Sequence, residues 1–322
     1  MNSSIGSTPA RGNRRGARRC VGGILLGTAL LSALPALADG RSAVRNLHAN
    51  AARARVILNL TEQSTQATPT LVRGVYALTD AQGKGAGYIN ESGTLYGDAS
   101  GFRVFPADGS PPRTLTPAET AVLRGEVMQA IDYDQLIKVQ YGDGGGRRMV
   151  MFSALDCGYC KLFEKHFSEL GKTNNTTFYV VPLSLRSSQA GGAQVWQDVA
   201  RIWCDSNNGD AWKRYWASGQ LPPARACAID ARAAERSNLA LQTILEAVGL
   251  PVKGTPTLLR EDGVKLKVSD LRSYLKQPAP PTPTAQPVWL VAENGPPQRV
   301  DEAAPSPSNK VNLGDMLKKL VK

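Results

Sequence analysis

Two cysteines separated by two residues carry the clearest chemical meaning in this sequence. Cys157 and Cys160 lie in ALDCGYCKLFEKHF, between an apolar run and a segment whose apolar residues recur at helical spacing. Such a pair can bind zinc, form a structural crosslink or carry out thiol–disulfide exchange. A structural zinc site requires four ligands, and the chain has one such pair and two histidines, His48 and His166. We therefore expect no metal site.

The position of the pair favours redox chemistry over an inert crosslink. We expect Cys157 at the N-terminus of a helix, where partial positive charge favours the thiolate over the thiol. Cys160, one turn further along, would be less exposed and able to attack a mixed disulfide formed at Cys157. The pattern predicts Cys157 as the nucleophile and Cys160 as the resolving thiol.

A third element lies about a hundred residues downstream, in the stretch VKGTPTLL. Thr255 precedes Pro256 at the start of an expected strand, and a cis peptide bond occurs almost only before proline. A loop of this kind, folded opposite the cysteines, could offer the backbone of Thr255 to an extended substrate. The motif is weak alone and strong together with an upstream Cys-x-x-Cys pair.

The elements that must position these groups alternate between strands and helices. We expect strands at 148–155 and 176–185, a hairpin at 255–268, and helices after the cysteines, at 238–249 and at 269–276. An insertion over residues 187–228 contains four tryptophans and is expected to form a helical subdomain. This alternation is typical of an α/β layer fold.

The region before this pattern is expected to form a separate α+β domain. Residues 39–106 contain a possible helix at 42–60 and strand-like runs at 71–80, 85–93 and 94–105, divided by turn residues. A linker helix should follow, with Thr116 as N-cap, Pro117 at the first helical position and Glu119 completing a capping box.

The N-terminus reads as a secretory signal. The first 38 residues carry five arginines and no acid, followed by an apolar run that ends in Ala-Leu-Ala. A membrane anchor is the alternative, but the apolar run is short and interrupted by glycine. Without these arginines the formal charge falls from +11 to +6, and no dense basic patch suggests nucleic acid. We expect export and no nucleic-acid partner.

The C-terminus differs in composition from the rest of the chain. Beyond Lys276 it becomes rich in proline, and residues 311–322 have apolar residues on one helical face. We expect a spacer followed by a short helix that either packs on its own protein or docks on another. Truncation after Lys276 is expected to leave stability nearly unchanged.

Several motifs together resemble the bacterial periplasmic disulfide isomerases of the DsbC/DsbG type. The resemblance covers roughly residues 142–276 and rests on FSALDCGYCKLFEKHF, RIWCDSNNGDAWKRYW, CAID and GTPTLLREDG. The N-terminal region is similar more faintly, through GVYALTDAQGKGAGYINESG. Cys-Gly-Tyr-Cys is the dithiol typical of the isomerases, and Thr before the cis-proline is also typical of them. The proline-rich extension has no counterpart in this family.

The resemblance implies a role for each matching residue. Cys157 would attack and Cys160 would resolve, while Thr255, Pro256 and the two residues between the cysteines, Gly158 and Tyr159, would meet the substrate. The distant cysteines Cys204 and Cys227 match the structural disulfide of the family, in a compartment where disulfides persist.

The expected organisation is a thioredoxin-like α/β fold with a helical insertion, preceded by a small α+β dimerisation domain. The segments are a signal peptide at 1–38, the dimerisation domain at 39–108, a linker helix at 109–141, the catalytic domain at 142–277 and the extension at 278–322. A homodimer would form by strand pairing around residues 75–78 or 88–95.

The expected activity is that of a periplasmic thiol:disulfide isomerase and reductase. It needs no cofactor, acts on misfolded or disulfide-containing periplasmic proteins, and by resemblance is kept reduced by a membrane electron donor of the DsbD type. Two alternatives remain open: a dithiol oxidase, and a partner-binding component of an envelope assembly in which the redox chemistry is incidental.

Overall fold

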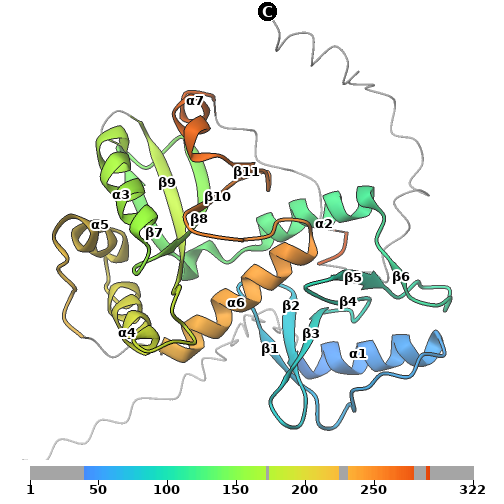
Figure 1. Ribbon diagram of the computed structural model, residues 1–322. Coiled ribbons are helices and arrows are strands. Elements are labelled where there is room, and N and C mark those ends of the chain that lie inside the picture. Colours follow the sequence, from blue (N-terminus) through green and yellow to red (C-terminus); the bar gives the residue numbers. More distant parts are fainter. Residues whose placement is uncertain (1–39, 172–173, 225–230, 279–287, 291–322) are drawn as a thin grey trace, which may run out of the picture. The chain divides into compact units, whose positions relative to one another are not determined.

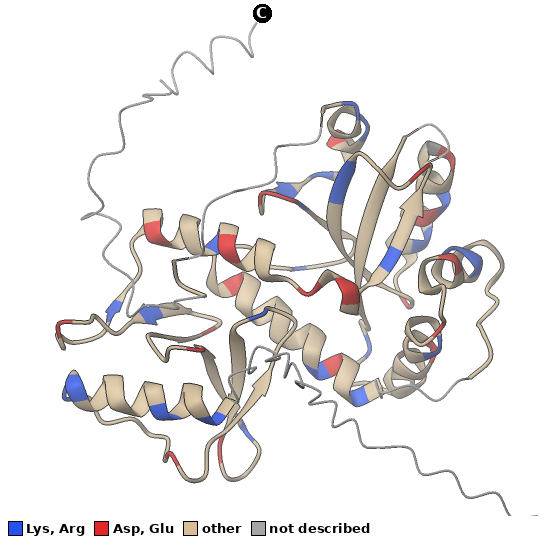
Figure 2. Ribbon diagram, turned by 180° about the vertical axis from the view of Figure 1, so that it is seen from behind, with Lys and Arg blue, Asp and Glu red and all other residues tan. Residues whose placement is uncertain are grey.

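The computed structural model describes residues 40–171, 174–224, 231–278 and 288–290. Within these ranges the chain builds two β-sheets, one before the linker helix and one around the cysteine pair (Figure 1). Basic and acidic residues occur together on both parts rather than being separated by sign (Figure 2). None of the described helices combines the length and the apolar character needed to cross a bilayer.

The N-terminal sheet is antiparallel, and its six strands follow one another in sequence order. They are β1 (Gln66–Pro69), β2 (Val75–Thr79), β3 (Gly85–Asn90), β4 (Leu95–Asp98), β5 (Gly101–Val104) and β6 (Arg113–Thr114). Helix α1 (Gly40–Arg53) packs against β1 and β3, and its Val44 and Leu47 share a buried cluster with Leu78 and Ile89. The helix ends earlier than the expected residue 60.

The order of the strands corrects the expected site of dimerisation. Residues 75–78 lie in β2 and residues 88–95 run from β3 into β4, and each of these strands already pairs with a neighbour on both sides. Their backbone groups are therefore not free to pair with a second copy. Only β1 and β6 are edges of this sheet, so any strand-mediated dimer must use one of them.

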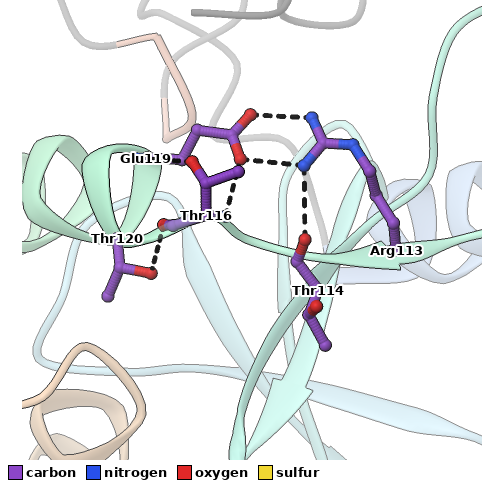
Figure 3. A network of polar contacts seen from close by, with 5 residues as sticks. All are labelled: Arg113, Thr114, Thr116, Glu119 and Thr120. Atoms are coloured by element: carbon purple, nitrogen blue, oxygen red, sulfur yellow. Dashed lines mark hydrogen bonds and ion pairs between the residues drawn. The ribbon is translucent and has the colours of Figure 1, made fainter.

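The linker helix α2 (Pro117–Ala130) begins where the sequence predicted. The hydroxyl of Thr116 accepts from the Glu119 amide at 3.2 Å, and the Thr116 amide donates to the Glu119 carboxylate at 2.8 Å (Figure 3). Arg113 of β6 donates to both oxygens of this carboxylate, at 2.8 and 2.7 Å. The Arg113 guanidinium is the main reason that the pKa of Glu119 falls to about 2. The capping box thus also fixes the start of α2 to the last strand of the N-terminal sheet.

The second sheet has five strands in the order β11-β10-β8-β9-β7. Its strands are β7 (Ile137–Tyr141), β8 (Arg147–Ala154), β9 (Thr176–Leu183), β10 (Thr257–Arg260) and β11 (Lys265–Leu266). β8 and β9 are parallel and the other pairs antiparallel. Because β8 is buried along nearly its whole length, it reads in the sequence as one continuous apolar run. β7 belongs to this sheet, so the domain starts before the expected residue 142.

The helices of this part are α3 (Gly158–Leu170), α4 (Gly192–Trp203), α5 (Asn208–Ser218), α6 (Ala231–Ala247) and α7 (Leu271–Leu275). Two one-turn helices add to them, η1 (Tyr133–Gln135) and η3 (Val268–Asp270). The predicted helical insertion is present as α4 and α5. Trp196, Trp203 and Trp212 are buried in a common cluster, against which Trp216 also packs.

The extension after Lys276 does not behave entirely as a spacer. Trp289 and Leu290 are 1% and 3% exposed and belong to the same buried cluster as Leu123 and Val127 of α2. The expectation that truncation after Lys276 is harmless is therefore wrong for these two residues. The sequence pattern missed them because a single Trp-Leu step between prolines has no periodicity. The helix expected at 311–322 lies outside the described residues.

A buried acid anchors α3, the helix that follows the cysteines. The indole Nε1 of Trp212 on α5 donates to Glu164 Oε1 at 2.7 Å, and the Tyr141 hydroxyl is a second hydrogen-bond partner. Glu164 is 4% exposed, and this burial raises its pKa from 4.5 to about 7. The folded chain therefore holds Glu164 as a neutral acid below pH 7, and α5 and β7 meet α3 at this group.

This burial predicts a pH-dependent contribution to stability. Because the pKa is raised on folding, the contribution is fully present below about pH 4.5 and is lost as the pH rises to about 7. We expect the wild-type free energy of unfolding to fall over this interval by roughly 3 kcal/mol more than that of Glu164→Gln, which keeps an acceptor for Trp212. Urea denaturation across the pH range measures this, with the exposed Glu246→Gln as control. Parallel profiles for wild type and Glu164→Gln would contradict a buried neutral acid.

Candidate active site

The first cysteine sits at the junction of β8 and α3, as predicted. β8 ends at Ala154, and the Cys157 amide donates to the Ala154 carbonyl at 3.1 Å, which closes the turn. Cys157 is the N-cap of α3 in an extended conformation, and its Sγ accepts from the Cys160 amide at 3.3 Å. A sulfur therefore takes the place that Ser, Thr or Asp oxygens usually hold at a helix start. The sulfur predicted to be the nucleophile is thus also the cap of the helix.

The Thr-Pro loop faces this sulfur. The peptide bond between Thr255 and Pro256 is cis, and the Thr255 carbonyl accepts from Cys157 Sγ at 3.4 Å. The approach follows from the sheet, because β10 pairs antiparallel with β8 and puts Thr257 opposite Phe152. The start of one strand and the end of the other therefore meet at the same edge. The structure thus brings together the two motifs that the sequence had placed about a hundred residues apart.

The two thiols have opposite electrostatic surroundings. Burial alone would raise the pKa of the Cys157 thiol, but contacts with the Thr255 and Cys160 side chains and with the amides of Cys160 and Tyr159 outweigh it and lower the pKa. Cys160 is fully buried, and this burial raises its pKa to about 11. Neither thiol is in a disulfide. The surroundings therefore favour the thiolate at Cys157 and the protonated thiol at Cys160.

An apolar groove runs beside the dithiol. Its volume is about 380 Å³. It is lined by one face of α3, by Pro256, and by Val268 of η3 and Leu271 of α7. Tyr159 is 77% exposed, and Leu162 and Val268, which line the same groove, are about half exposed. These large apolar side chains form an exposed apolar surface next to the dithiol. Tyr159 and Pro256, both predicted to meet substrate, lie on this groove.

A second groove is lined by Cys157 itself. It has a volume of about 580 Å³ and is lined by Cys157, Gly158 and Lys161 together with residues 215–219 at the end of α5. A Cβ placed on Gly158 would meet no heavy atom within 4 Å. Gly158 therefore adds no side chain to this groove, in whose wall Cys157 is 5% exposed.

Asp156 is a positioning residue that the sequence analysis did not identify. Its carboxylate accepts from the Ser184 hydroxyl at 3.1 Å and from the amides of Leu185 and Arg186 at 3.0 and 3.2 Å. These bonds tie the loop after β9 to the residue that immediately precedes Cys157. The sequence shows only that an acid directly precedes the dithiol, and this position alone does not identify the hydrogen-bond partners of Asp156.

The second cysteine pair can be followed at one end only. Cys204, at the end of α4, is disulfide-bonded, while Cys227 lies outside the described residues. The pairing of Cys204 with Cys227 therefore stays a prediction. Among the residues that the structure describes, no three His, Cys, Asp or Glu side chains gather as a metal site would require.

The comparisons with known proteins agree with this geometry. Residues 134–278 match the family model of the thioredoxin-like domain. Over 154 residues the chain is 29% identical to proteins named probable thiol:disulfide interchange protein DsbC from Bordetella parapertussis and Bordetella bronchiseptica. The matched region is 46% of this chain and 49% of each relative, so the chain spans about half the length of the curated relatives it matches.

Solved structures give weaker likenesses. A disulfide interchange protein from Neisseria gonorrhoeae has a TM-score of 0.35 at 22% identity, over 45% of this chain and 99% of that one. A linker-deletion variant of Proteus mirabilis ScsC has a TM-score of 0.37 at 16% identity, over 50% and 82%.

The parallel β8–β9 core, the dithiol at the start of α3, the cis-proline loop opposite it and the match over residues 134–278 lead to one assignment. This part of the chain is a thioredoxin-like domain, and it is similar to the thiol:disulfide interchange proteins of the DsbC type.

Proposed function

We propose that the chain is an exported thiol:disulfide isomerase and reductase that acts on disulfide-containing proteins of the periplasm. The observation that carries this proposal is the asymmetry of the dithiol. Cys157 has a lowered pKa and lies at a helix start beside an open groove, while the pKa of the buried Cys160 is raised to about 11. A pair in which one thiol attacks readily and the other stays protonated is suited to an enzyme that reduces or rearranges disulfides already present in its substrate.

The first step is attack of the Cys157 thiolate on a substrate disulfide. A bond forms between Cys157 Sγ and one substrate sulfur, and the bond between the two substrate sulfurs breaks, so that the second sulfur leaves as a thiolate. Burial keeps Cys160 protonated, with a pKa of about 11, and therefore delays its attack on this mixed disulfide. The substrate has time to rearrange before it is released.

Two exits from the mixed disulfide are available. A different thiolate of the substrate can attack its own sulfur, which forms a new substrate disulfide and returns Cys157 unchanged, with no net oxidation or reduction. Alternatively, Cys160 loses its proton and attacks Cys157, which releases the substrate as a dithiol and leaves a Cys157–Cys160 disulfide. The second exit consumes two electrons, so an external dithiol reductant must restore the pair. By resemblance we assign this role to a membrane electron donor of the DsbD type.

The surfaces around the dithiol support a substrate that is an unfolded polypeptide. The apolar groove along α3 can accept exposed apolar side chains, which misfolded proteins present. The Thr255 carbonyl, now in contact with Cys157, lies where an extended chain could donate a backbone hydrogen bond to it. Recognition of backbone and apolar surface would make the enzyme tolerant of sequence.

Export and dimerisation complete the proposal. The arginine-rich start and apolar run of the first 38 residues support a cleaved signal, and N-terminal sequencing of the mature protein should then begin near Asp39. Two catalytic domains on a shared base would raise the effective concentration of thiols at one bound substrate. We assign this base to the N-terminal sheet, through its β1 or β6 edge.

Isomerase activity is tested with a scrambled multi-disulfide protein in the absence of net oxidant. We expect the wild type to restore the native pairing and Cys157→Ser to fall to the uncatalysed rate, because the attacking sulfur is gone. Cys160→Ala is the matched control: it should retain isomerisation and accumulate mixed disulfides on Cys157, which mass spectrometry identifies. An enzyme that oxidises reduced substrate quickly but leaves scrambled substrate unchanged would instead be a dithiol oxidase. Full cellular function of the double variant lacking both thiols would favour an assembly role.

The dimer is tested by light scattering of the full mature chain at micromolar concentration. We expect a mass close to twice that of the protomer. Because β1 is an edge strand and the amide of Ala67 points away from β2, Ala67→Pro should abolish a dimer paired through β1 and leave a dimer paired through β6 intact. A monomeric wild type would contradict the shared base and favour the oxidase.

A further inference from the structure

Three consecutive residues of the C-terminal extension are held by one carboxylate. The amide of Val288 donates to Glu126 Oε1 at 2.7 Å, and those of Trp289 and Leu290 donate to Oε2 at 2.8 and 3.2 Å. Asn90, at the end of β3, donates from Nδ2 to the Trp289 carbonyl at 2.6 Å. These contacts join segments separated by more than 160 positions in the chain, which local structure cannot explain.

The two side chains next to these bonds fill a closed site. Trp289 and Leu290 belong to a buried cluster that contains Leu71 and Val75 of the N-terminal region and Met128 of α2. The backbone of the segment also approaches closely. A Cβ added to Gly74, which has φ of +78°, would lie 2.7 Å from the Leu290 carbonyl oxygen. Any side chain at position 74 would therefore push the segment away.

The buried carboxylate of Glu126 needs hydrogen-bond donors. Glu126 is 7% exposed, and no Lys or Arg among the described residues forms an ion pair with it. A buried carboxylate without partners is strongly unfavourable, and the three amides of the extension are the donors found here. Without the segment, the Glu126 carboxylate on α2 would lose these three donors. The space that the Trp289 and Leu290 side chains fill would become an apolar cavity.

We propose that Glu126, Asn90 and Gly74 form a peptide-recognition site whose ligand is the segment Val288–Leu290 of the same chain. The Glu126 carboxylate accepts hydrogen bonds from three successive backbone N–H groups, and the side chains of Trp289 and Leu290 are buried in the core. It fastens Val288–Leu290 to α2 and to the N-terminal sheet.

The site also limits how far two parts of the chain can separate. On the catalytic side, Arg147 Nη1 donates to the Pro278 carbonyl at 2.7 Å and fixes the chain there. Nine residues, 279–287, connect this point to Val288. A connection of this length spans at most roughly 35 Å when fully extended. The extension is therefore a second chain connection, besides α2, between the catalytic domain and the N-terminal sheet, and it adds to the contacts that α6 makes with β4 and β5.

The proposal is tested by cutting this second connection in the full chain. A recognition sequence for a site-specific protease is inserted within residues 279–287, and the native protein is cleaved and passed over a size-exclusion column. We expect the C-terminal fragment to elute with the body under native conditions and to separate in urea. Release of the fragment from the unsubstituted, folded body would overturn the proposal.

Two variants show whether the named contacts hold the fragment. Glu126→Gln removes the charge and one acceptor, and Trp289→Ala removes the largest buried side chain, so each should increase the released fraction about tenfold or more. Glu91→Gln, the same change at an exposed position beside the site, is the matched control and should retain the fragment. Retention by both variants equal to that of the control would also overturn the proposal. If a variant fails to fold, slow hydrogen exchange at the amides of residues 288–290 in the uncleaved wild type is decisive, and fast exchange there contradicts the site.

Discussion

The Cys160 amide pointing at the Cys157 sulfur is the interaction on which the site depends. It requires that Cys157 be the N-cap of α3, which in turn requires β8 to end at Ala154 and the helix to start at Gly158. The same contact helps to lower the pKa of Cys157, and burial one turn later raises that of Cys160. One turn of helix thus separates a sulfur whose pKa is lowered from one whose pKa is raised.

The surrounding fold holds this turn from several directions. Pairing of β10 with β8 sets the Thr255 carbonyl against the sulfur, and Asp156 ties the loop after β9 to the same turn. Further along α3, the Glu164 carboxyl is fixed by Trp212 of the helical insertion. Helix α5 of the insertion therefore helps to hold α3, the helix that carries the dithiol, in place. Two grooves lie next to this turn, one lined by Tyr159 and Pro256 and the other by Cys157 and Gly158.

The parts predicted from sequence were those with a local chemical signature. The capping box at Thr116, the strand before the dithiol, the cis bond at Pro256 and the tryptophan-rich insertion all leave short-range patterns, and the structure confirms them. Strand order leaves no such pattern, which is why dimer pairing was expected around residues 75–78 or 88–95, in strands that do not lie at an edge of the sheet. The partners of Glu126, Asp156 and Glu164 come from distant segments, and a lone acid in a sequence does not name them. The burial of Trp289 was not predicted, because a single Trp-Leu step between prolines has no periodicity.

The most direct test of the account is the separate titration of the two thiols. NMR of the full mature chain with labelled cysteine reports the ionisation of each sulfur through its Cβ shift, and Cys157→Ser and Cys160→Ala assign the signals. We expect Cys157 to ionise below the ordinary range of a thiol and Cys160 to remain protonated until about pH 11. If both thiols ionise together in the ordinary range, the helix cap does not create the asymmetry, and the proposed mechanism is wrong.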